Sequence, residues 1–192
     1  SNQTWLVIGL GNPGPDYASH RHNVGHMVVD KLVSDLGASF RSHKANAMVA
    51  EARVVPGGPK LVLAKFGTFM NLSGKPTAAL ATFYKVEPAN IIVVHDELDI
   101  DFDDVRIKVG GGHAGHNGLR DIIAAIGSPD FVRVRVVVGR PPGRGDAADF
   151  VLKPFSKSER EVLPFVLDRS ADAVCSIATE GVLAAQQKFH SP

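Results

Sequence analysis

A histidine and an aspartate far apart in the sequence carry the side chains that hydrolytic chemistry needs. His22 is a candidate general base, because imidazole titrates near neutral pH and can take a proton from water. Asp96, at the end of an apolar run, can accept the other ring N–H of such a histidine, fix its tautomer and raise its basicity. Spacing alone supports a second interpretation of His22 equally well, as a helix-capping or surface histidine.

Three asparagines are suited to a reaction that passes through an oxyanion. Asn12, Asn71 and Asn117 each carry a neutral amide, which can donate to a carbonyl oxygen or hold a water without competing for its proton. No serine or cysteine stands in the G-x-S-x-G context of a nucleophile elbow. We therefore expect water to be the nucleophile and the reaction to be direct hydrolysis of an ester or an amide.

The histidines also raise the alternative of a metal-dependent hydrolase. His20, His22 and His26 lie close together in the sequence, as do His113 and His116, and Asp96 and Glu97 follow His95. The chain has no H-E-x-x-H segment and no cysteine and histidine pair at the spacing of a zinc site. We therefore expect neither a catalytic metal nor another cofactor.

A glycine-rich turn at residues 9–14, G-L-G-N-P-G, has the spacing of a dinucleotide-binding fingerprint. In a dinucleotide fold a helix begins at the third glycine, and an acidic residue ends the next strand. Here the helical pattern starts only near His22, and the acid at the expected spacing, Asp30, lies inside that pattern. The context argues against a dinucleotide site and indicates that the turn presents Asn12.

Basic residues alternate along two apolar runs in the second half of the chain. This pattern is typical of a phosphate-binding stripe and equally of a solvated sheet face. The basic residues of this pattern and of the segment that follows the second run are Arg106, Lys108, Arg133, Arg135, Arg140 and Arg144.

A glycine-rich segment at 110–118 either offers backbone N–H groups to an anion or forms a mobile lid, and it lacks the lysine of a P-loop.

The composition is that of an ordinary globular domain. The chain has 192 residues, of which 44% are hydrophobic and 21% charged, and its net charge is +1, so contact with a polyanion requires a local patch. We expect a single domain over residues 1–192 and a monomer. The single cysteine, Cys175, fits a reducing compartment, and we expect a cytoplasmic protein with no membrane span because no long apolar run is present.

Apolar periodicity predicts an α/β fold. Strand-like runs lie at 4–9, 48–54, 60–66, 91–95, 105–109 and 132–138, and helical spacing at 22–36, 73–85, 116–126, 157–167 and 170–188. The turn P-G-G-P at 56–59 predicts an antiparallel hairpin, and Ser156 with Glu159 predicts a capping box. The order of elements predicts a mixed, mostly parallel twisted sheet flanked by helices.

Polar side chains follow several of the predicted strands at the point where each strand ends. They are Asn12, Asn71, Asp96 and the segment 113–117. Open α/β sheets bind ligands outside the carboxyl ends of their strands, so we expect these side chains to converge on one crevice.

Five segments, taken together, resemble the bacterial peptidyl-tRNA hydrolase family. They are GLGNPGPDYASHRHNVG, GTFMNLSG, HDELDI, GGGHAGHNGLRDI and FVRVRVVVGRPPG, in register from about residue 5 to about residue 155. The resemblance implies an enzyme that cleaves the ester between a peptide and the terminal ribose of tRNA, with peptidyl-tRNA as its partner.

The resemblance also implies roles for individual residues. His22 would activate the water and Asp96 would orient it. The remaining residues would hold the substrate: Asn12, Asn71 and Asn117 at the reacting groups, Tyr17 and Met70 along the pocket, and Lys108 and Arg135 as a clamp for a tRNA phosphate.

Two positions depart from the family pattern. His26 stands where an aromatic residue is usual, which puts the packing around His22 in question, and Gly67 suggests a looser turn. The rival interpretations are a tRNA-binding module without turnover, a metal-dependent hydrolase and a dinucleotide-dependent enzyme.

Overall fold

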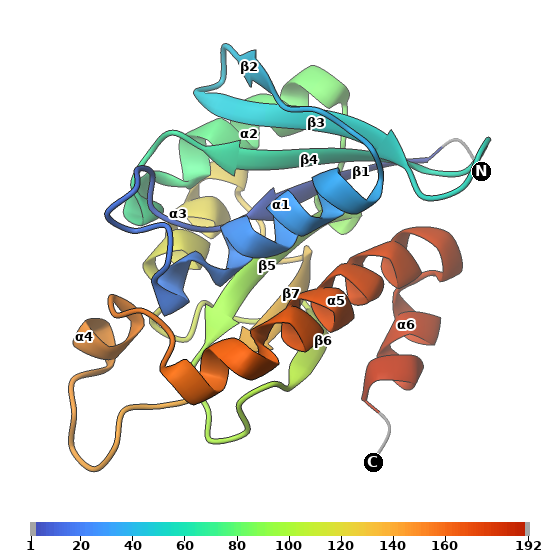
Figure 1. The fold of residues 1–192 in the computed structure, drawn as a ribbon. Coiled ribbons are helices and arrows are strands. Elements are labelled where there is room, and N and C mark those ends of the chain that lie inside the picture. Colours follow the sequence, from blue (N-terminus) through green and yellow to red (C-terminus); the bar gives the residue numbers. More distant parts are fainter. Residues whose placement is uncertain (1–2, 191–192) are drawn as a thin grey trace.

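A computed structural model describes residues 3–190 of the chain, and residues 1–2 and 191–192 lie outside the described part. Within residues 3–190, seven strands form one sheet in the order β2-β3-β4-β1-β5-β7-β6 (Figure 1). Their bounds are β1 Thr4–Gly9, β2 Arg41–His43, β3 Ala47–Arg53, β4 Lys60–Phe66, β5 Ile91–Glu97, β6 Val105–Val109 and β7 Val132–Val137.

The four central strands are parallel, and the strands at both edges are antiparallel to their neighbours. β1 pairs in parallel with β4 and β5, and β5 pairs in parallel with β7. β2 is antiparallel to β3, β3 to β4, and β6 to β7. The predicted α/β fold with a mixed sheet is confirmed.

Helices cover both faces of the sheet. Figure 1 shows α1, α5 and α6 in front of the sheet, with α2 and α3 behind it. No helix of the described residues is long and apolar enough to cross a membrane. The helices are α1 Val24–Asp35, α2 Gly74–Tyr84, α3 Asn117–Ile126, α4 Ala147–Val151, α5 Lys157–Glu180 and α6 Val182–Phe189, and the short 3-10 helices are η1 Arg21–Asn23, η2 Met70–Leu72 and η3 Pro88–Asn90.

The central strands are buried on both faces, which explains why their sequences are continuous apolar runs. Val7 and Val94 belong to the core beneath α1, α5 and α6, and Ile8 and Val93 to the core beneath α2 and α3. Full burial of each such side chain stabilises the fold by about 1.5–3 kcal/mol. The carboxyl ends of β1 and β5 are therefore firmly held.

Most of the predicted elements are present. All six predicted strands occur, the turn at 56–59 joins β3 and β4 as an antiparallel hairpin, and Ser156 and Glu159 form the capping box. The sequence pattern gives no signal for β2 or α4, because their three and five residues are too few to show a periodicity.

The prediction of separate helices over 157–167 and 170–188 is wrong. α5 runs unbroken through Pro164, and α6 begins only after Gly181, whose φ is 93°. The buried side chains of Val166, Ser170 and Val174 continue the helical spacing across the expected break. The packing of this stripe against the sheet keeps the helix continuous.

The direction of β6 also differs from the expectation that its end lies at the same edge as the ends of the parallel strands. β6 is antiparallel to β7, so Val109 pairs with Val132, the first residue of β7. The glycine-rich segment 110–116 therefore has to return across the sheet. Arg133 holds this return, because its guanidinium donates to two carbonyl oxygens of the segment at 2.6 and 2.8 Å.

Candidate active site

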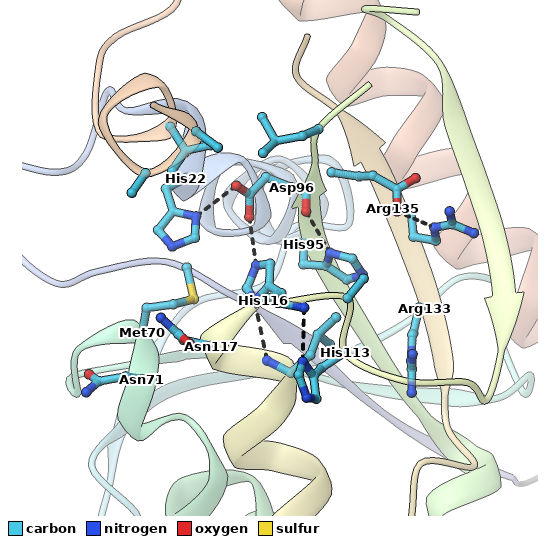
Figure 2. Close-up of a pocket in the computed structure, with 18 of the residues that line it drawn as sticks. His22, Met70, Asn71, His95, Asp96, His113, His116, Asn117, Arg133 and Arg135 are labelled. Carbon is cyan, nitrogen blue, oxygen red and sulfur yellow. Dashed lines mark hydrogen bonds and ion pairs between the residues drawn. The ribbon is translucent and has the colours of Figure 1, made fainter. Parts of the chain in front are cut away.

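A cavity of about 690 Å³ opens at the carboxyl edge of the parallel strands (Figure 2). Tyr17 lies outside its lining, with its ring edge-on to Phe69 at 5.9 Å between centroids, and Phe69 precedes Met70 in the cavity wall. The other predicted site residues all line the cavity: Asn12, His22, Met70, Asn71, Asp96, Lys108, Asn117 and Arg135.

Two glycines allow the segment carrying His22 to approach the sheet closely. A Cβ on Gly9 would overlap the carbonyl oxygen of Gly25, and a Cβ on Gly25 would overlap the carbonyl oxygen of Val94. The start of α1 consequently rests on the backbone of β1 and β5. This contact brings His22, in η1, beside Asp96 near the end of β5.

Asp96 lies between two histidines that come from opposite faces of the sheet. Its Oδ2 is 2.8 Å from Nδ1 of His22, next to α1, and its Oδ1 is 2.8 Å from Nε2 of His116, at the start of α3 (Figure 2). The aspartate is 5% exposed. Both carboxylate oxygens are thus occupied by imidazole nitrogens.

The hydrogen bonds assign the protonation of both rings. Nδ1 of His116 accepts from the backbone N–H of Leu119 at 3.4 Å, as the N-cap of α3, so its Nε2 carries the proton donated to Asp96. His22 faces Asp96 with Nδ1, so Nε2 of the neutral ring is left with a free lone pair.

Asp96 makes His22 a stronger base. Burial lowers the pKa of His22, but the charge of Asp96 and the hydrogen bond to it outweigh burial, and the pKa lies above the ordinary 6.5. Burial alone would raise the pKa of Asp96, yet the two histidines hold it well below its usual range. The carboxylate is therefore ionised at neutral pH, beside a ring that readily gains a proton.

The sequence placed His116 among possible metal ligands and in the segment expected at the crevice, but it did not predict the contact of His116 with Asp96. The available signal was its place directly before Asn117 in the glycine-rich segment. The role of His95, which the sequence raised only among possible metal ligands, was also missed. Its Nδ1 donates to the backbone carbonyl of Asp96 at 2.8 Å, and burial lowers its pKa to about 3. His95 is therefore a neutral ring that holds the backbone of Asp96 in place through this hydrogen bond.

Asn12 is held in place by a second asparagine that the sequence did not single out. The side chain of Asn23 accepts from the backbone N–H of Asn12 at 2.9 Å and donates to its carbonyl oxygen at 2.8 Å. Oδ1 of Asn12 accepts from the backbone N–H of Met70 at 2.7 Å. The amide NH₂ of Asn12 is consequently the group left to donate to a ligand.

Asn71 and Asn117 extend the amide lining of the cavity. Asn71 lies in η2 and Asn117 is the first residue of α3, and both are exposed on the cavity wall. Neither side-chain amide has a hydrogen-bond partner among residues 3–190, so both are available to a ligand.

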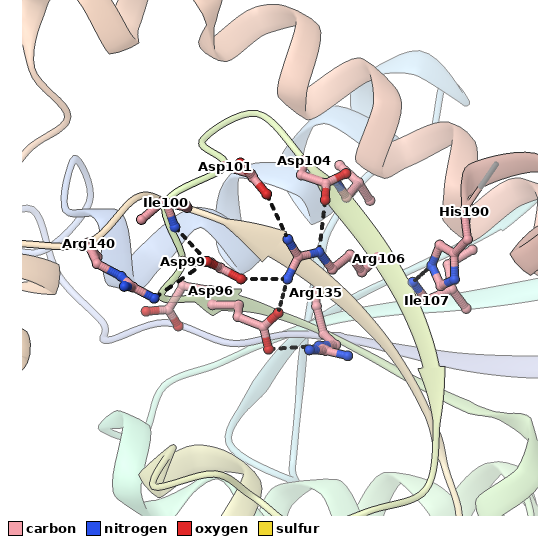
Figure 3. A network of polar contacts seen from close by, with 12 residues as sticks. Asp96, Asp99, Ile100, Asp101, Asp104, Arg106, Ile107, Arg135, Arg140 and His190 are labelled. Carbon is pink, nitrogen blue, oxygen red and sulfur yellow. Dashed lines mark hydrogen bonds and ion pairs between the residues drawn. The ribbon is translucent and has the colours of Figure 1, made fainter. Parts of the chain in front are cut away.

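Two arginines of the predicted basic stripe are engaged in ion pairs or hydrogen bonds within the protein. Arg106 forms ion pairs at 2.8 Å with Asp99 and with Asp104 (Figure 3). Arg133 is only 2% exposed and bonds to backbone carbonyls. Arg106 is therefore largely neutralised, and Arg133 belongs neither to a phosphate stripe nor to a solvated sheet face, because burial decides its role.

The two residues predicted to contact a tRNA phosphate differ in their surroundings. Nε of Arg135 donates to Glu97 at 2.7 Å (Figure 3). Lys108 lines the same cavity and forms no ion pair with any described residue. Lys108 therefore offers the free charge, and Arg135 has to share its charge with Glu97.

The two departures from the family pattern fit into the packing. The ring of His26 lies against Gly11, and burial, with the charge of Lys65, lowers its pKa to about 4, so it packs as a neutral ring. The expectation of a looser turn at Gly67 is wrong. Its N–H donates to the carbonyl of Asn46 at 2.9 Å, and the side chain of Asn46 occupies the place of a Cβ.

His22, Asp96 and His116 place possible metal-ligating atoms within 4.8 Å of one another. Nδ1 of His22, Nε2 of His116 and both carboxylate oxygens of Asp96 already take part in the two 2.8 Å hydrogen bonds of this cluster. A metal ion bound through these atoms would have to displace both shared protons, so the geometry favours hydrogen bonding over metal binding.

The glycine-rich turn lacks the surroundings of a dinucleotide site. No helix starts at Gly14, whose φ is 97°, and α1 begins only at Val24. Asp30 lies in α1 and forms an ion pair with Lys65 at 2.6 Å. The turn instead carries Asn12 into the cavity.

An ionised aspartate, a histidine with a raised pKa and unpartnered amides lie around one cavity on a mixed α/β sheet, and the described residues that line the cavity include no serine, threonine or cysteine. This arrangement is typical of a hydrolytic enzyme. The sequence model of the family described as peptidyl-tRNA hydrolase matches residues 6–192. The chain belongs to the peptidyl-tRNA hydrolase family.

Relatives and solved structures agree with this assignment. The chain is 60% identical over 190 residues to the peptidyl-tRNA hydrolase of Renibacterium salmoninarum, covering 98% of each chain. It is 61% identical over 187 residues to that of Leifsonia xyli, covering 97% of each. The crystal structure of peptidyl-tRNA hydrolase from Acinetobacter baumannii superposes with a TM-score of 0.88 at 32% identity, covering 100% of this chain and 97% of the other.

Proposed function

We propose that the protein hydrolyses the ester between peptide and tRNA in peptidyl-tRNA, with water activated by His22. The observation that carries this proposal is the 2.8 Å contact between Nδ1 of His22 and the buried Asp96, at the edge of the cavity. Because Nδ1 is committed to Asp96, Nε2 is the nitrogen that takes a proton from water.

The proposed reaction has two proton transfers and no covalent enzyme intermediate. Nε2 of His22 removes a proton from water as the oxygen attacks the ester carbonyl carbon. The carbonyl electrons move to the oxygen, and an amide NH₂ group of Asn12, Asn71 or Asn117 donates to this oxyanion. When the intermediate collapses, the bond to the ribose oxygen breaks and the imidazolium returns its proton to that oxygen.

Asp96 has two functions in this scheme. It holds His22 in the tautomer whose Nε2 is free, and its negative charge stabilises the imidazolium that forms during water attack. His116 occupies the second carboxylate oxygen and so keeps the aspartate oriented. Neither function requires a metal ion.

The other residues are assigned to substrate binding. Met70 lines the cavity, and Tyr17 lies outside the lining and contacts Phe69, the residue before Met70. Lys108 supplies a free ammonium for a tRNA phosphate, with Arg135 as a second cation that is partly neutralised by Glu97. We further infer a monomer, since one copy of the chain completes the cavity, and light scattering of the purified protein tests the oligomeric state. We also infer that the protein acts in the cytoplasm, in keeping with its single cysteine.

The test measures release of peptide from N-blocked aminoacyl-tRNA by wild type, His22→Ala and a control, His43→Ala, each with and without EDTA. His43 lies in β2 at the far edge of the sheet and contacts Phe83. General-base catalysis contributes about 10²–10⁴-fold, so His22→Ala is expected to lose that much activity, while His43→Ala and EDTA leave the rate unchanged.

The other possible outcomes would each contradict a different part of the proposal. Full activity in His22→Ala would refute the mechanism. Loss of activity in EDTA would favour the metal-dependent hydrolase. Binding of tRNA with no turnover by wild type would favour a tRNA-binding module.

A further inference from the structure

Three consecutive residues of η1 point in three directions, and only the middle one lines the cavity. His22 reaches Asp96, and Asn23 holds the backbone of Asn12. Arg21 is 7% exposed and contacts the chain near the start of α5 instead. The turn that carries His22 is therefore anchored on both sides.

The guanidinium of Arg21 is held by two hydrogen bonds and an aromatic ring. It donates to the carbonyl oxygen of Phe150 at 3.1 Å and to the carboxylate of Glu159 at 2.8 Å. It also stacks on the ring of Phe150, 3.9 Å from the centroid. A planar guanidinium can satisfy these contacts together, whereas the compact ammonium of a lysine cannot.

The backbone of the same turn is tied to the same distant segment. The N–H of Arg21 donates to the carbonyl of Lys153 at 3.0 Å, and His20 forms a β-bridge with Pro154. In Figure 1 the start of α1 lies beside α4 and the start of α5. The residue before His22 is thus fixed through both its main chain and its side chain.

The segment that holds Arg21 is also one wall of the cavity. Ala147, Ala148 and Val151 of α4 line the cavity, and Phe150, which holds Arg21, lies among them in the same helix. A displacement of this wall would therefore move Arg21 and the turn that follows it.

We propose that Arg21 is a positioning residue, which ties the turn carrying His22 to α4 and α5 and so holds the imidazole in register with Asp96. The inference rests on the proposed role of His22 as the base. Arg21 does not line the cavity, so it acts only through His22. A misplacement of about 1 Å can cost 10²-fold in rate, which makes such an anchor measurable.

The test compares Arg21→Met with Lys31→Met in the full chain. Lys31 joins α1 to α5 through a 2.8 Å ion pair with Asp168, so its removal perturbs the same two helices without touching η1. We measure the melting temperature first, and then kcat, KM and their pH dependence at a temperature where each variant is folded.

Arg21→Met is expected to lower kcat by about 10- to 10²-fold with little change in KM. The acid limb of its pH profile is expected to move to lower pH, because a displaced His22 loses part of the contact with Asp96 that raises its pKa. Lys31→Met is expected to change neither kcat nor the acid limb.

Glu159→Gln gives a second test that is independent of the folding of Arg21→Met. Glutamine preserves the capping box of α5 but removes the charge that pairs with Arg21. A smaller fall in kcat and a smaller shift of the acid limb, in the same direction, are therefore expected. Wild-type kcat and an unmoved acid limb in the folded variants would overturn the proposal. Full activity in His22→Ala would instead refute the proposed role of His22 as general base. The failure of that role can thus be told apart from the failure of the proposed role of Arg21.

Discussion

Replacing Asp96 with asparagine is expected to damage the enzyme more than replacing it with alanine. The carboxylate accepts one N–H from His22 and one from His116, each at 2.8 Å. An asparagine has one acceptor oxygen and one NH₂ group, so it accepts from only one ring. The other ring must turn a lone pair towards the new amide.

His22 is the ring that is expected to change tautomer. His116 uses Nδ1 to accept from Leu119, and an N-cap of this kind is worth about 0.5–2 kcal/mol. Since every 1.4 kcal/mol is a factor of ten, the changed tautomer of His22 is favoured by about 2- to 30-fold. In that tautomer Nε2 carries a proton and cannot take one from water.

The charge of Asp96 is lost in the same variant. That charge holds the pKa of His22 above its ordinary value against the opposing effect of burial. Together the two losses are expected to lower kcat by about 10²–10⁴-fold, the contribution of general-base catalysis. Alanine leaves His22 free to adopt either tautomer, so Asp96→Ala is expected to be impaired less than Asp96→Asn or His22→Ala.

The assay is single-turnover hydrolysis of N-blocked aminoacyl-tRNA at neutral pH, combined with ¹⁵N NMR of His22 to identify its protonated nitrogen. Asp168→Asn is the control, since Asp168 is a surface acid that pairs with Lys31. The reasoning is refuted if Asp96→Asn is as fast as Asp96→Ala, or if Nε2 of His22 is unprotonated in the asparagine variant.

Three further predictions concern the surroundings of the site. Asn23→Ala leaves the buried backbone groups of Asn12 unsatisfied at a cost of about 1–3 kcal/mol. Its melting temperature is expected to fall by about 2–4 °C per kcal/mol, and an unchanged value in calorimetry would contradict the anchoring role. Lys108→Ala is expected to weaken binding of whole tRNA, with a salt slope shallower by about 0.7–0.9 per phosphate lost, while hydrolysis of a short peptidyl-nucleotide is retained. Equal losses on both substrates would exclude a phosphate contact. His26 has a pKa lowered by burial to about 4, whereas an unfolded histidine takes up its proton near 6.5. The stability present above pH 6.5 is therefore lost as the pH falls towards 4, by about 2 kcal/mol at pH 5. The melting temperature of His26→Phe is expected to depend less on pH over this range than that of wild type. If melting temperature varies with pH equally in both proteins, groups other than His26 cause the loss of stability.

Local sequence patterns determined the elements and the kind of chemistry. The apolar runs of β1 and β5 were recognisable because a strand buried on both faces needs apolar side chains on both. The rule that ligands bind at the carboxyl ends of parallel strands then brought Asn12, Asn71 and Asp96 to one crevice. The family resemblance, carried by short segments in register, singled out His22 from the other histidines.

Tertiary structure alone decided which partners surround those residues. His116 meets Asp96 from 20 positions away, and Arg21 meets Glu159 from 138 positions away. Likewise, the antiparallel course of β6 set the path of the segment carrying His116, and burial turned Arg133 into a backbone anchor. Periodicity records which face of an element is buried. It does not record which polar group stands opposite, because that depends on how segments distant in sequence pack together.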